Sequence, residues 1–383
     1  MHSIRLLACV GVVVGATAYV LMSSSCGRDA DPRSLQAEAS KGAATAEAPP
    51  GSATEPGGAL SAGSTVLAAA SAPAAQGTAG PQGMASASKI EPAVSKPVRV
   101  TFVGDLAMTG MVAHYLERRA AGKKTPAGVD EHYPFTGVRD RLTEADLAIG
   151  NLECVVSKIG TKATWHNPFR APLLSIPVIL DSGIDMVGVA NNHTLDYGYG
   201  AFEDMLRNLD RGGLPYAGRE AFQAGPQPAV VREIRGIRIG VLAYGDVPAE
   251  RAYADVRASR AAADVLMVFN HWGLEGDAEP LLQQRRFGRG LIDAGADLVV
   301  GTHAHVLQSE EWYHGKLIEY GLGNFVFSEM LHPEKVRIGA MLEVEIDRTG
   351  VLERRLLRTR VDDLGAPWFI DDPTKAVAMK PPH

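Results

Sequence analysis

The sequence has few cysteines, no surplus of positive charge, and a long stretch without aromatic residues. Only three cysteines occur in 383 residues, and Cys154 is the only one beyond Cys26, so no disulfide can form within the later part of the chain. Lys and Arg total 38 against 44 Asp and Glu, and the basic residues are scattered. Nucleic-acid binding requires a basic surface, so we expect no nucleic-acid partner.

The absence of Phe, Tyr and Trp is complete from residue 27 to residue 96, where Ala, Gly, Ser and Pro dominate. A chain of this composition has too little apolar surface to offset the entropy lost on folding. We therefore predict that residues 27–96 form a disordered linker.

Residues 1–26 carry a targeting pattern. Arg5 precedes an apolar run from Leu6 to Met22, which is typical of a signal peptide and is also long enough for an uncleaved membrane anchor. Cys26 follows three serines and offers a third possibility, a lipidated cysteine. We expect a signal-anchored protein or a lipoprotein of the cell envelope, tethered to the membrane through its N-terminus with the domain outside the cytoplasm.

Apolar runs of strand length alternate with helical patterns from residue 97 to residue 365, which predicts one α/β domain, followed by a C-terminal tail over residues 366–383. Helices are expected at residues 108–120, 199–209 and 280–293. Turn residues predict hairpins at Arg235 and Gly236 and at residues 348–350. Strand-helix repeats combined with hairpins favour two stacked mixed sheets with helices outside them, a four-layer α-β-β-α sandwich.

Five apolar runs each end in side chains that can bind a metal ion. The runs are VRVTFVGD, ADLAIGNLE, IDMVGVANNH, ADVLMVFNHWG and ADLVVGTHAH, and the candidate ligands at their ends are Asp105; Asn151 and Glu153; Asn191, Asn192 and His193; Asn270 and His271; and His303 and His305. Because the carboxyl ends of strands gather at one edge of an α/β sheet, a shared site is the simplest explanation. Carboxylate, amide and imidazole groups together suit Mn, Fe or Zn rather than Ca²⁺. The set exceeds the roughly three protein ligands of one catalytic zinc, so we predict two divalent metal ions.

Each cluster alone has an ordinary structural interpretation. Asp105 follows a glycine as in a turn, the two asparagines before His193 can form an Asx-turn, and His271 can be a packing residue. His303 and His305 are more specific, because residues two apart on a strand project to the same side. The recurrence of ligand chemistry after five separate runs favours the metal site.

Six motifs follow one another along the chain: GD ending at Asp105, NLE ending at Glu153, ANNHTLDYG from Ala190, HWGLE from His271, GADLVVGTHAHVLQ from Gly295 and EYGLGNFVF from Glu319. Over residues 99–327 they resemble the CapA family, which is associated with bacterial capsule and poly-γ-glutamate synthesis. That family is similar in fold to the calcineurin-like metallophosphoesterases. The resemblance therefore implies a fold of that type and a hydrolase-like metal centre.

The resemblance also implies roles for the ligands. One metal ion would be bound by Asp105 and His305 and the other by Asn192, His271 and His303, with Asn151 or Glu153 at the bridging position. His193 would face the substrate as general acid. Two departures mark the CapA branch: Ala107 stands where the superfamily commonly has histidine, and Asn151 where it has the bridging aspartate.

Residues beside the ligands complete the predicted site. Asp196 and Glu275 are candidate catalytic carboxylates that fix the orientation of the imidazoles. Asp196 can instead cap the helix expected at Tyr199. The candidate substrate contacts are Asn191, Trp272 and Asn324.

Two classes of function follow. The first is a hydrolase, in which two metal ions position and deprotonate a water that attacks a phosphoester; hydrolysis of a γ-glutamyl amide would use the same metals. The second is a non-catalytic, metal-dependent surface protein that binds or guides an anionic polymer during capsule assembly. The expected partners are an anionic surface polymer or phosphoester substrate and other membrane components of capsule synthesis.

Overall fold

The structure is a computed structural model that describes residues 96–164, 167–219 and 225–382. The predicted signal peptide or anchor over residues 1–26, and the predicted linker up to residue 95, lie outside the described residues. Within the described ranges, no helix combines the length and the apolar character needed to span a bilayer.

The first sheet has eight strands, and β1 lies in its interior. Its strands are β1 (Val98–Leu106), β2 (Leu147–Leu152), β3 (Met186–Gly188), β4 (Tyr216–Ala217), β11 (Asn324–Val326), β12 (Ile338–Asp347), β13 (Gly350–Val361) and β14 (Pro367–Phe369). Their order is β14-β13-β12-β1-β2-β3-β4, with β11 paired to β1. Strands β1 to β4 run parallel, and β12 to β14 are antiparallel.

The second sheet has six strands in the order β5-β6-β7-β8-β10-β9. They are β5 (Val230–Ile234), β6 (Ile237–Tyr244), β7 (Val265–His271), β8 (Leu298–Thr302), β9 (Glu310–Tyr313) and β10 (Lys316–Glu319). The four inner strands are parallel, and β5 and β9 are antiparallel edges.

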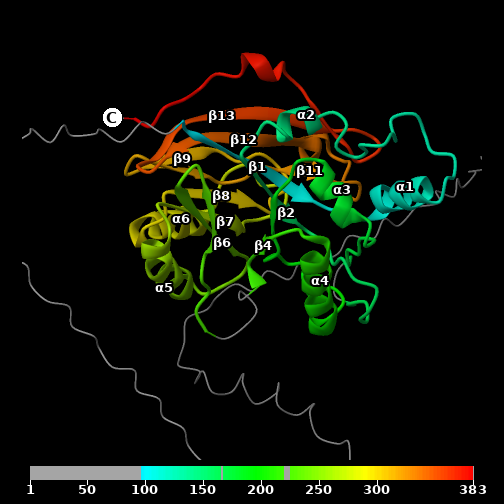
Figure 1. Cartoon of the computed structure of the whole chain (residues 1–383), viewed down its shortest axis with the longest axis horizontal. Helices are drawn as coiled ribbons and strands as arrows, with labels where there is room; N and C mark the ends of the chain where they lie inside the picture. The colour runs from blue at the N-terminus through cyan, green and yellow to red at the C-terminus, as the bar shows by residue number, and fades with distance from the viewer. Residues whose placement is uncertain (1–95, 165–166, 220–224, 383) are drawn as a thin grey trace, which may run out of the picture. The chain divides into compact units, whose positions relative to one another are not determined.

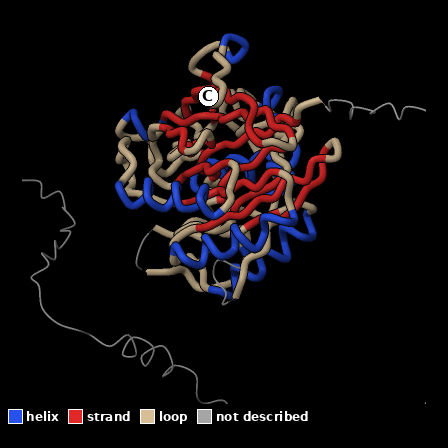
Figure 2. The backbone as a smooth tube through the Cα atoms, turned by 90° about the vertical axis from the view of Figure 1, so that its left-hand side faces the viewer, coloured by secondary structure: helices blue, strands red, loops and turns tan. Residues whose placement is uncertain are grey.

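Helices cover the outer face of each sheet. The first sheet is covered by α1 (Gly110–Ala120), α2 (Arg139–Leu142), α3 (Ser175–Asp181) and α4 (Tyr199–Gly212), and the second by α5 (Ala249–Ser259) and α6 (Leu282–Ala294). Short 3₁₀ turns are η3 (Arg260–Ala262), η4 (Glu334–Arg337) and η5 (Pro373–Lys375). Figures 1 and 2 show the strands in the middle of the domain with helices outside them. The predicted four-layer α-β-β-α sandwich is confirmed.

The two sheets share a hydrophobic core that lies between them. On β1, Val100 and Phe102 point into this layer, while Val103 points toward the helices of the first sheet. Phe102 packs on Phe269 of β7, with ring centroids 5.6 Å apart. Because both faces of the sheets are covered, their central strands are apolar without interruption. These strands are therefore the apolar runs that the sequence pattern predicts.

The predicted hairpins and helices are found, with shifted ends. Arg235 and Gly236 turn β5 into β6 with φ values of 51° and 76°, the left-handed conformations that a tight hairpin requires. The predicted helix from residue 280 begins at Leu282 instead. The domain boundary predicted at residue 365 is too early, because β14 pairs with β13 and a further bridge joins Arg354 to Met379.

Strand β10 ends in a buried acid, Glu319. The residue is 1% exposed, and its Oε2 atom has no hydrogen-bond partner among the described residues. Burial raises the pKa of Glu319 from 4.5 to about 8. The folded protein therefore holds this proton up to about pH 8, whereas the unfolded chain releases it at a much lower pH.

We expect the fold to lose stability as pH rises from about 5 to 8, because the folded state keeps the carboxyl group of Glu319 protonated. Between about pH 5 and 8 the folded state binds more protons than the unfolded state, so the free energy of unfolding should fall as pH rises, by up to ~1.4 kcal/mol per pH unit. Glu319→Gln should match the wild type at pH 5 and exceed it at pH 8 in denaturant unfolding. Glu117→Gln, on the exposed face of α1, is the control. A difference between Glu319→Gln and the wild type that is the same at both pH values would contradict this prediction.

Candidate metal centre

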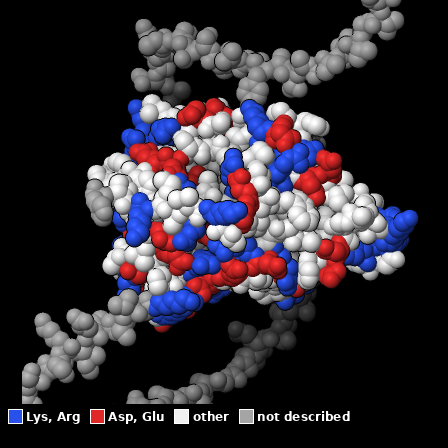
Figure 3. Space-filling model, turned by 90° about the horizontal axis from the view of Figure 1, so that it is seen from above, with Lys and Arg blue, Asp and Glu red and all other residues white. Residues whose placement is uncertain are grey.

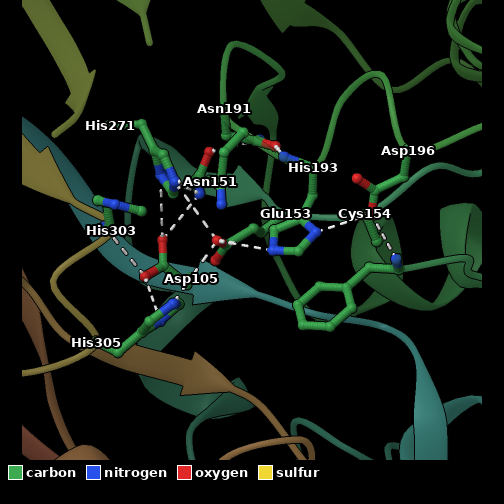
Figure 4. A network of polar contacts seen from close by, with 12 residues as sticks. Asp105, Asn151, Glu153, Cys154, Asn191, His193, Asp196, His271, His303 and His305 are labelled. Carbon is green, nitrogen blue, oxygen red and sulfur yellow. Dashed lines mark hydrogen bonds and ion pairs between the residues drawn. The ribbon is translucent and has the colours of Figure 1, made fainter. Parts of the chain in front are cut away.

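Side chains from both sheets meet at the carboxyl ends of the central strands (Figure 4). Asp105 lies near the end of β1, Glu153 directly follows β2, and His271 is the last residue of β7. His303 and His305 follow β8. The convergence predicted from the strand ends is therefore present in the fold.

Asp105 is held in place by three neighbours. Its side chain is fully buried, and its Oδ1 atom accepts a hydrogen bond of 2.8 Å from the amide of Asn151. Its Oδ2 atom accepts the backbone N–H of His303 at 3.3 Å and lies 3.3 Å from His305 Nδ1. The carboxylate thus ties β1 to the chain that follows β8.

Glu153 is the centre of the cluster. It is fully buried, and neither carboxylate oxygen has a hydrogen-bond partner among the described residues. Its Oε1 atom lies 3.4 Å from His271 Nε2, 3.9 Å from His305 Nε2 and 4.0 Å from His193 Nε2. Burial, reinforced by Asp105, raises the pKa of Glu153 well above its usual value. A buried carboxylate without hydrogen bonds is destabilising, and a bound cation would compensate for it.

His271 points both of its nitrogens at polar groups. Its Nε2 atom lies 2.7 Å from Asn192 Oδ1, on the side where Glu153 lies. Its Nδ1 atom lies 3.1 Å from both Thr302 Oγ1 and Asn151 Nδ2. Burial, together with the neighbouring histidines, lowers the pKa of His271 well below its usual value. A neutral imidazole is the form that binds a metal ion.

His303 and His305 lie in a bend rather than on a strand. Their φ values are 88° and 55°, left-handed conformations that cost about 1–3 kcal/mol for residues other than glycine. The extended geometry predicted for this pair is wrong, although both rings reach the cluster. His303 Nδ1 is buried without a partner among the described residues, and burial lowers the pKa of His303. Burial also opposes the charge of His305, but Glu153 and Asp105 outweigh this effect and raise its pKa.

Three overlapping groups of side chains can hold metal ions. They are Glu153, His271 and His303; Asp105, Glu153 and His305; and Glu275, His303 and His305, each with ligand atoms within 4.8 Å of one another. The first two groups share only Glu153, one of the two residues predicted for the bridging position. The other, Asn151, donates its amide nitrogen to Asp105 and accepts from Asn191 with its oxygen. Glu275, predicted to orient imidazoles, is exposed and forms one of these groups with His303 and His305.

His193 is oriented by Asp196 and by an aromatic ring. Its Nδ1 atom lies 2.8 Å from Asp196 Oδ2, and its Nε2 atom faces Glu153. The ring of Phe169 stacks on the imidazole with centroids 3.9 Å apart and an interplanar angle of 3°. Phe169 also donates its backbone N–H to Asp196 at 2.5 Å. Asp196 is therefore not the cap of α4, whose N-cap residue is Gly198.

Asn191 and Asn324, two of the predicted substrate contacts, take part in hydrogen bonds within the site, and of the two Asn191 also lines a cavity beside the cluster. Asn191 donates its amide to Asn151 and to the Leu152 carbonyl and accepts the backbone N–H of His193, as in an Asx-turn. Asn324 was predicted to contact substrate but is fully buried behind His305, with its Oδ1 atom 2.8 Å from Nδ1 of that ring.

The two residues flanking His271 in the sequence differ in their surroundings. Trp272 is 8% exposed and lines a cavity beside the cluster, as a substrate contact would. The buried amide of Asn270 has no hydrogen-bond partner among the described residues. Because successive side chains of a strand alternate between its faces, Asn270 lies on the opposite face from His271 and does not join the cluster.

Comparisons with known proteins agree with the motifs. A family model described as bacterial capsule synthesis protein PGA_cap matches residues 99–329. The chain is 28% identical over 290 residues to the PGA biosynthesis protein CapA of Bacillus subtilis (strain 168), covering 70% of this chain and 72% of that protein. The capsule biosynthesis protein CapA of Bacillus anthracis is 29% identical over 260 residues, covering 61% of each chain. A solved structure, of a hypothetical protein from Thermus thermophilus, has 18% identity and a TM-score of 0.40, covering 74% of this chain and 100% of that one.

Proposed function

The chain belongs to the CapA family, the bacterial capsule synthesis proteins of the PGA_cap type, and on this premise we propose that it is a hydrolase of capsule or poly-γ-glutamate synthesis with a centre of two divalent metal ions. The reaction we propose is the hydrolysis of a phosphoester. We also propose that the protein is exported and tethered to the membrane by residues 1–26, close to other membrane components of capsule synthesis.

The buried carboxylate of Glu153 supports this proposal most directly. It lies among the imidazoles of His193, His271 and His305, neither of its oxygens has a hydrogen-bond partner among the described residues, and it belongs to two overlapping groups of metal ligands. Such an arrangement is unfavourable for the protein alone and is explained by cations between the side chains. Mn, Fe and Zn fit the mixture of imidazole and carboxylate ligands.

Each residue of the cluster has a proposed role in binding metal or in proton transfer. Asp105 and His305 would hold one ion and Asn192, His271 and His303 the other, with Glu153 between them. When bound, the ions would supply a water of lowered pKa and would stabilise the negative charge of the transition state. His193 donates a proton from Nε2 to the leaving oxygen. Asp196 accepts from Nδ1 and so keeps a proton on that nitrogen, which means that the ring must be protonated at both nitrogens to donate from Nε2. The Phe169 ring keeps water from one face of the imidazole.

A second candidate function is that of a metal-dependent binding protein without catalysis. It is supported by Ala107 and Asn151, which replace two residues that the calcineurin-like metallophosphoesterases commonly use as ligands. A protein of this kind would bind or guide an anionic polymer through its metal ions without turning it over. On the face that carries β13, Lys and Arg are interspersed with Asp and Glu (Figure 3), and pairs such as Arg360 with Glu334 and Arg358 with Asp371 neutralise one another. That face offers a polyanion little attraction, so its binding would depend on the metal ions.

Metal binding is the first test of the proposal. Ligands from separate strand ends are brought together only by folding, so Mn²⁺, Zn²⁺ or Fe²⁺ should raise the melting temperature of the chelator-treated protein. At a free metal concentration a hundred times the Kd, the stabilisation should be about 2.7 kcal/mol. The double variant His303→Ala/His305→Ala should lose the shift, and His114→Ala, on the exposed side of α1, should keep it. The proposal fails if none of the three ions changes the melting temperature of the wild type.

A further inference from the structure

A large cavity opens directly beside the metal centre. Its volume is about 890 Å³, and His271 and His303 form part of its lining. The rest of the wall comes from the chain between β3 and α4, which contributes Asn191, Asn192 and Leu195, and from the loop after β6, the start of α5, the chain between β7 and α6, and α6 itself. A group bound at the metal centre would therefore project into this cavity, which we call the aromatic cavity.

The aromatic cavity takes its name from three packed rings. Trp272 and Phe287 meet edge to face with centroids 5.9 Å apart, and Tyr253 packs on Phe287 at 5.7 Å. The Trp272 indole is fixed by a hydrogen bond of 2.8 Å to the Tyr320 carbonyl. Val247, Leu274 and Leu281 extend the apolar wall. The rings support one another, so the wall does not depend on a ligand to form.

A glycine in β8 makes room for the indole. A Cβ atom at Gly301 would lie 2.3 Å from the Trp272 Nε1 atom and 2.1 Å from the Tyr320 carbonyl oxygen. Any larger residue there would displace the ring. The position of Trp272 therefore depends on the backbone of a strand that also leads to His303.

The charges of the aromatic cavity do not suit a polyanion. Apart from the two histidines, the described residues that line it include one acidic residue, Asp246, and one basic residue, Arg286. Each residue of a γ-glutamyl polymer carries a carboxylate, and the wall has no excess of positive charge to bind a row of them. Apolar and aromatic walls instead favour an uncharged, apolar group.

We propose that the aromatic cavity binds the apolar alcohol portion of a phosphoester whose phosphoryl group lies at the metal centre. This proposal rests on the proposed function and adds the class of substrate. In the reaction, the oxygen of water forms a bond to phosphorus, the bond from phosphorus to the alcohol oxygen breaks, and the alcohol leaves with a proton. The products are phosphate and an apolar alcohol, either aromatic or a long aliphatic chain.

Phosphonates of increasing chain length test the cavity without requiring turnover. The metal-loaded protein would be titrated calorimetrically with ethyl-, butyl- and octylphosphonate, and with benzylphosphonate as the aromatic probe. Each methylene buried should tighten binding about fourfold, so octylphosphonate should bind at least a hundredfold more tightly than ethylphosphonate. Tight binding of benzylphosphonate would identify an aromatic alcohol, and a preference for octylphosphonate alone an aliphatic one. Equal affinity across the series would overturn the proposal.

Two variants locate the binding. Phe287→Ala removes the ring at the centre of the wall, and Leu274→Ser changes a 55% exposed rim residue that has little role in folding. Both should reduce the dependence on chain length while keeping the metal-induced rise in melting temperature. Leu282→Ser is the matched control, because Leu282, the first residue of α6, is 63% exposed but does not line the cavity. If the chain-length dependence survives in both cavity variants, the apolar group binds elsewhere and the proposal is wrong.

A γ-glutamyl oligomer separates this proposal from polymer binding. It should displace octylphosphonate no better than glutamate does, and stronger displacement would assign the cavity to the polymer. If the proposed hydrolase function is wrong but the cavity proposal is right, the result is different. In that case metal-loaded protein would bind the phosphonates with the expected chain-length dependence but would hydrolyse no phosphoester.

Discussion

Replacing His193 with alanine should lower the turnover of a reactive aryl phosphoester by about a hundredfold or more, which is the usual contribution of a general acid. The reason is the geometry at Nε2, which faces the cluster while Nδ1 is held by Asp196 at 2.8 Å. His193 belongs to none of the three groups of metal ligands. The variant should therefore keep its metal content and its metal-induced rise in melting temperature. The measurement is steady-state kinetics together with metal analysis on the same preparations.

Two further variants sharpen this experiment. Asp196→Asn should also lose activity, because an amide can stabilise the wrong tautomer of the imidazole, and its pH profile should differ from that of the wild type. His114→Ala should leave turnover unchanged. If His193→Ala loses metal while remaining folded, the histidine is a ligand and the assignment is wrong. A metal-loaded wild type without turnover of phosphomonoesters, phosphodiesters or γ-glutamyl peptides would instead favour the binding protein.

Glu153→Gln should leave the metal-free protein at least as stable as the wild type but make the metal-loaded protein less stable. Without metal, the variant replaces a fully buried, unpartnered carboxyl group with a neutral amide, so it should unfold at the same denaturant concentration as the wild type or at a higher one. With metal, it should lose most of the stabilisation, which for the wild type reaches about 4 kcal/mol at a thousand times the Kd. Denaturant unfolding with and without Mn²⁺ or Zn²⁺ measures both effects.

Glu275→Gln is the matched control for Glu153→Gln. Its carboxylate is exposed at the edge of the cluster and belongs to one ligand group, whereas Glu153 belongs to two. It should keep most of the metal-induced stabilisation. Equal losses in the two variants would show that Glu153 is not a bridge. A large destabilisation of metal-free Glu153→Gln would show that the carboxylate already has a stabilising partner in the protein.

The strand-end ligands could be predicted because their signal is local. Asp105, Glu153 and His271 each lie at the end of an apolar run, and the rule that parallel strands end at one edge of a sheet brings them together. The same local signal placed Asn270 in the site wrongly. Alternation along β7 directs its side chain away from His271, and the sequence motif alone did not separate the two residues.

The remaining parts of the site depend on contacts between distant segments. Phe169 stacks on His193 from a loop whose sequence carries no ligand pattern. Asn324 supports His305 because β11 pairs with β1, a pairing between segments far apart in the chain. The left-handed backbone of His303 and His305 is maintained by the packing around it, so the sequence alone suggested an extended strand.

The position of β1 between β2 and β12 has a consequence for how the protein folds during synthesis. Arg99 of β1 and its ion-pair partner Glu345 of β12 are 246 residues apart, whereas β2 follows β1 closely. The edge of β1 that pairs with β12 therefore stays unpaired until nearly all of the domain has left the ribosome. Long-range strand pairing of this kind slows folding, and an open apolar edge invites pairing with other chains. Chains truncated before Ile338 should consequently aggregate rather than fold.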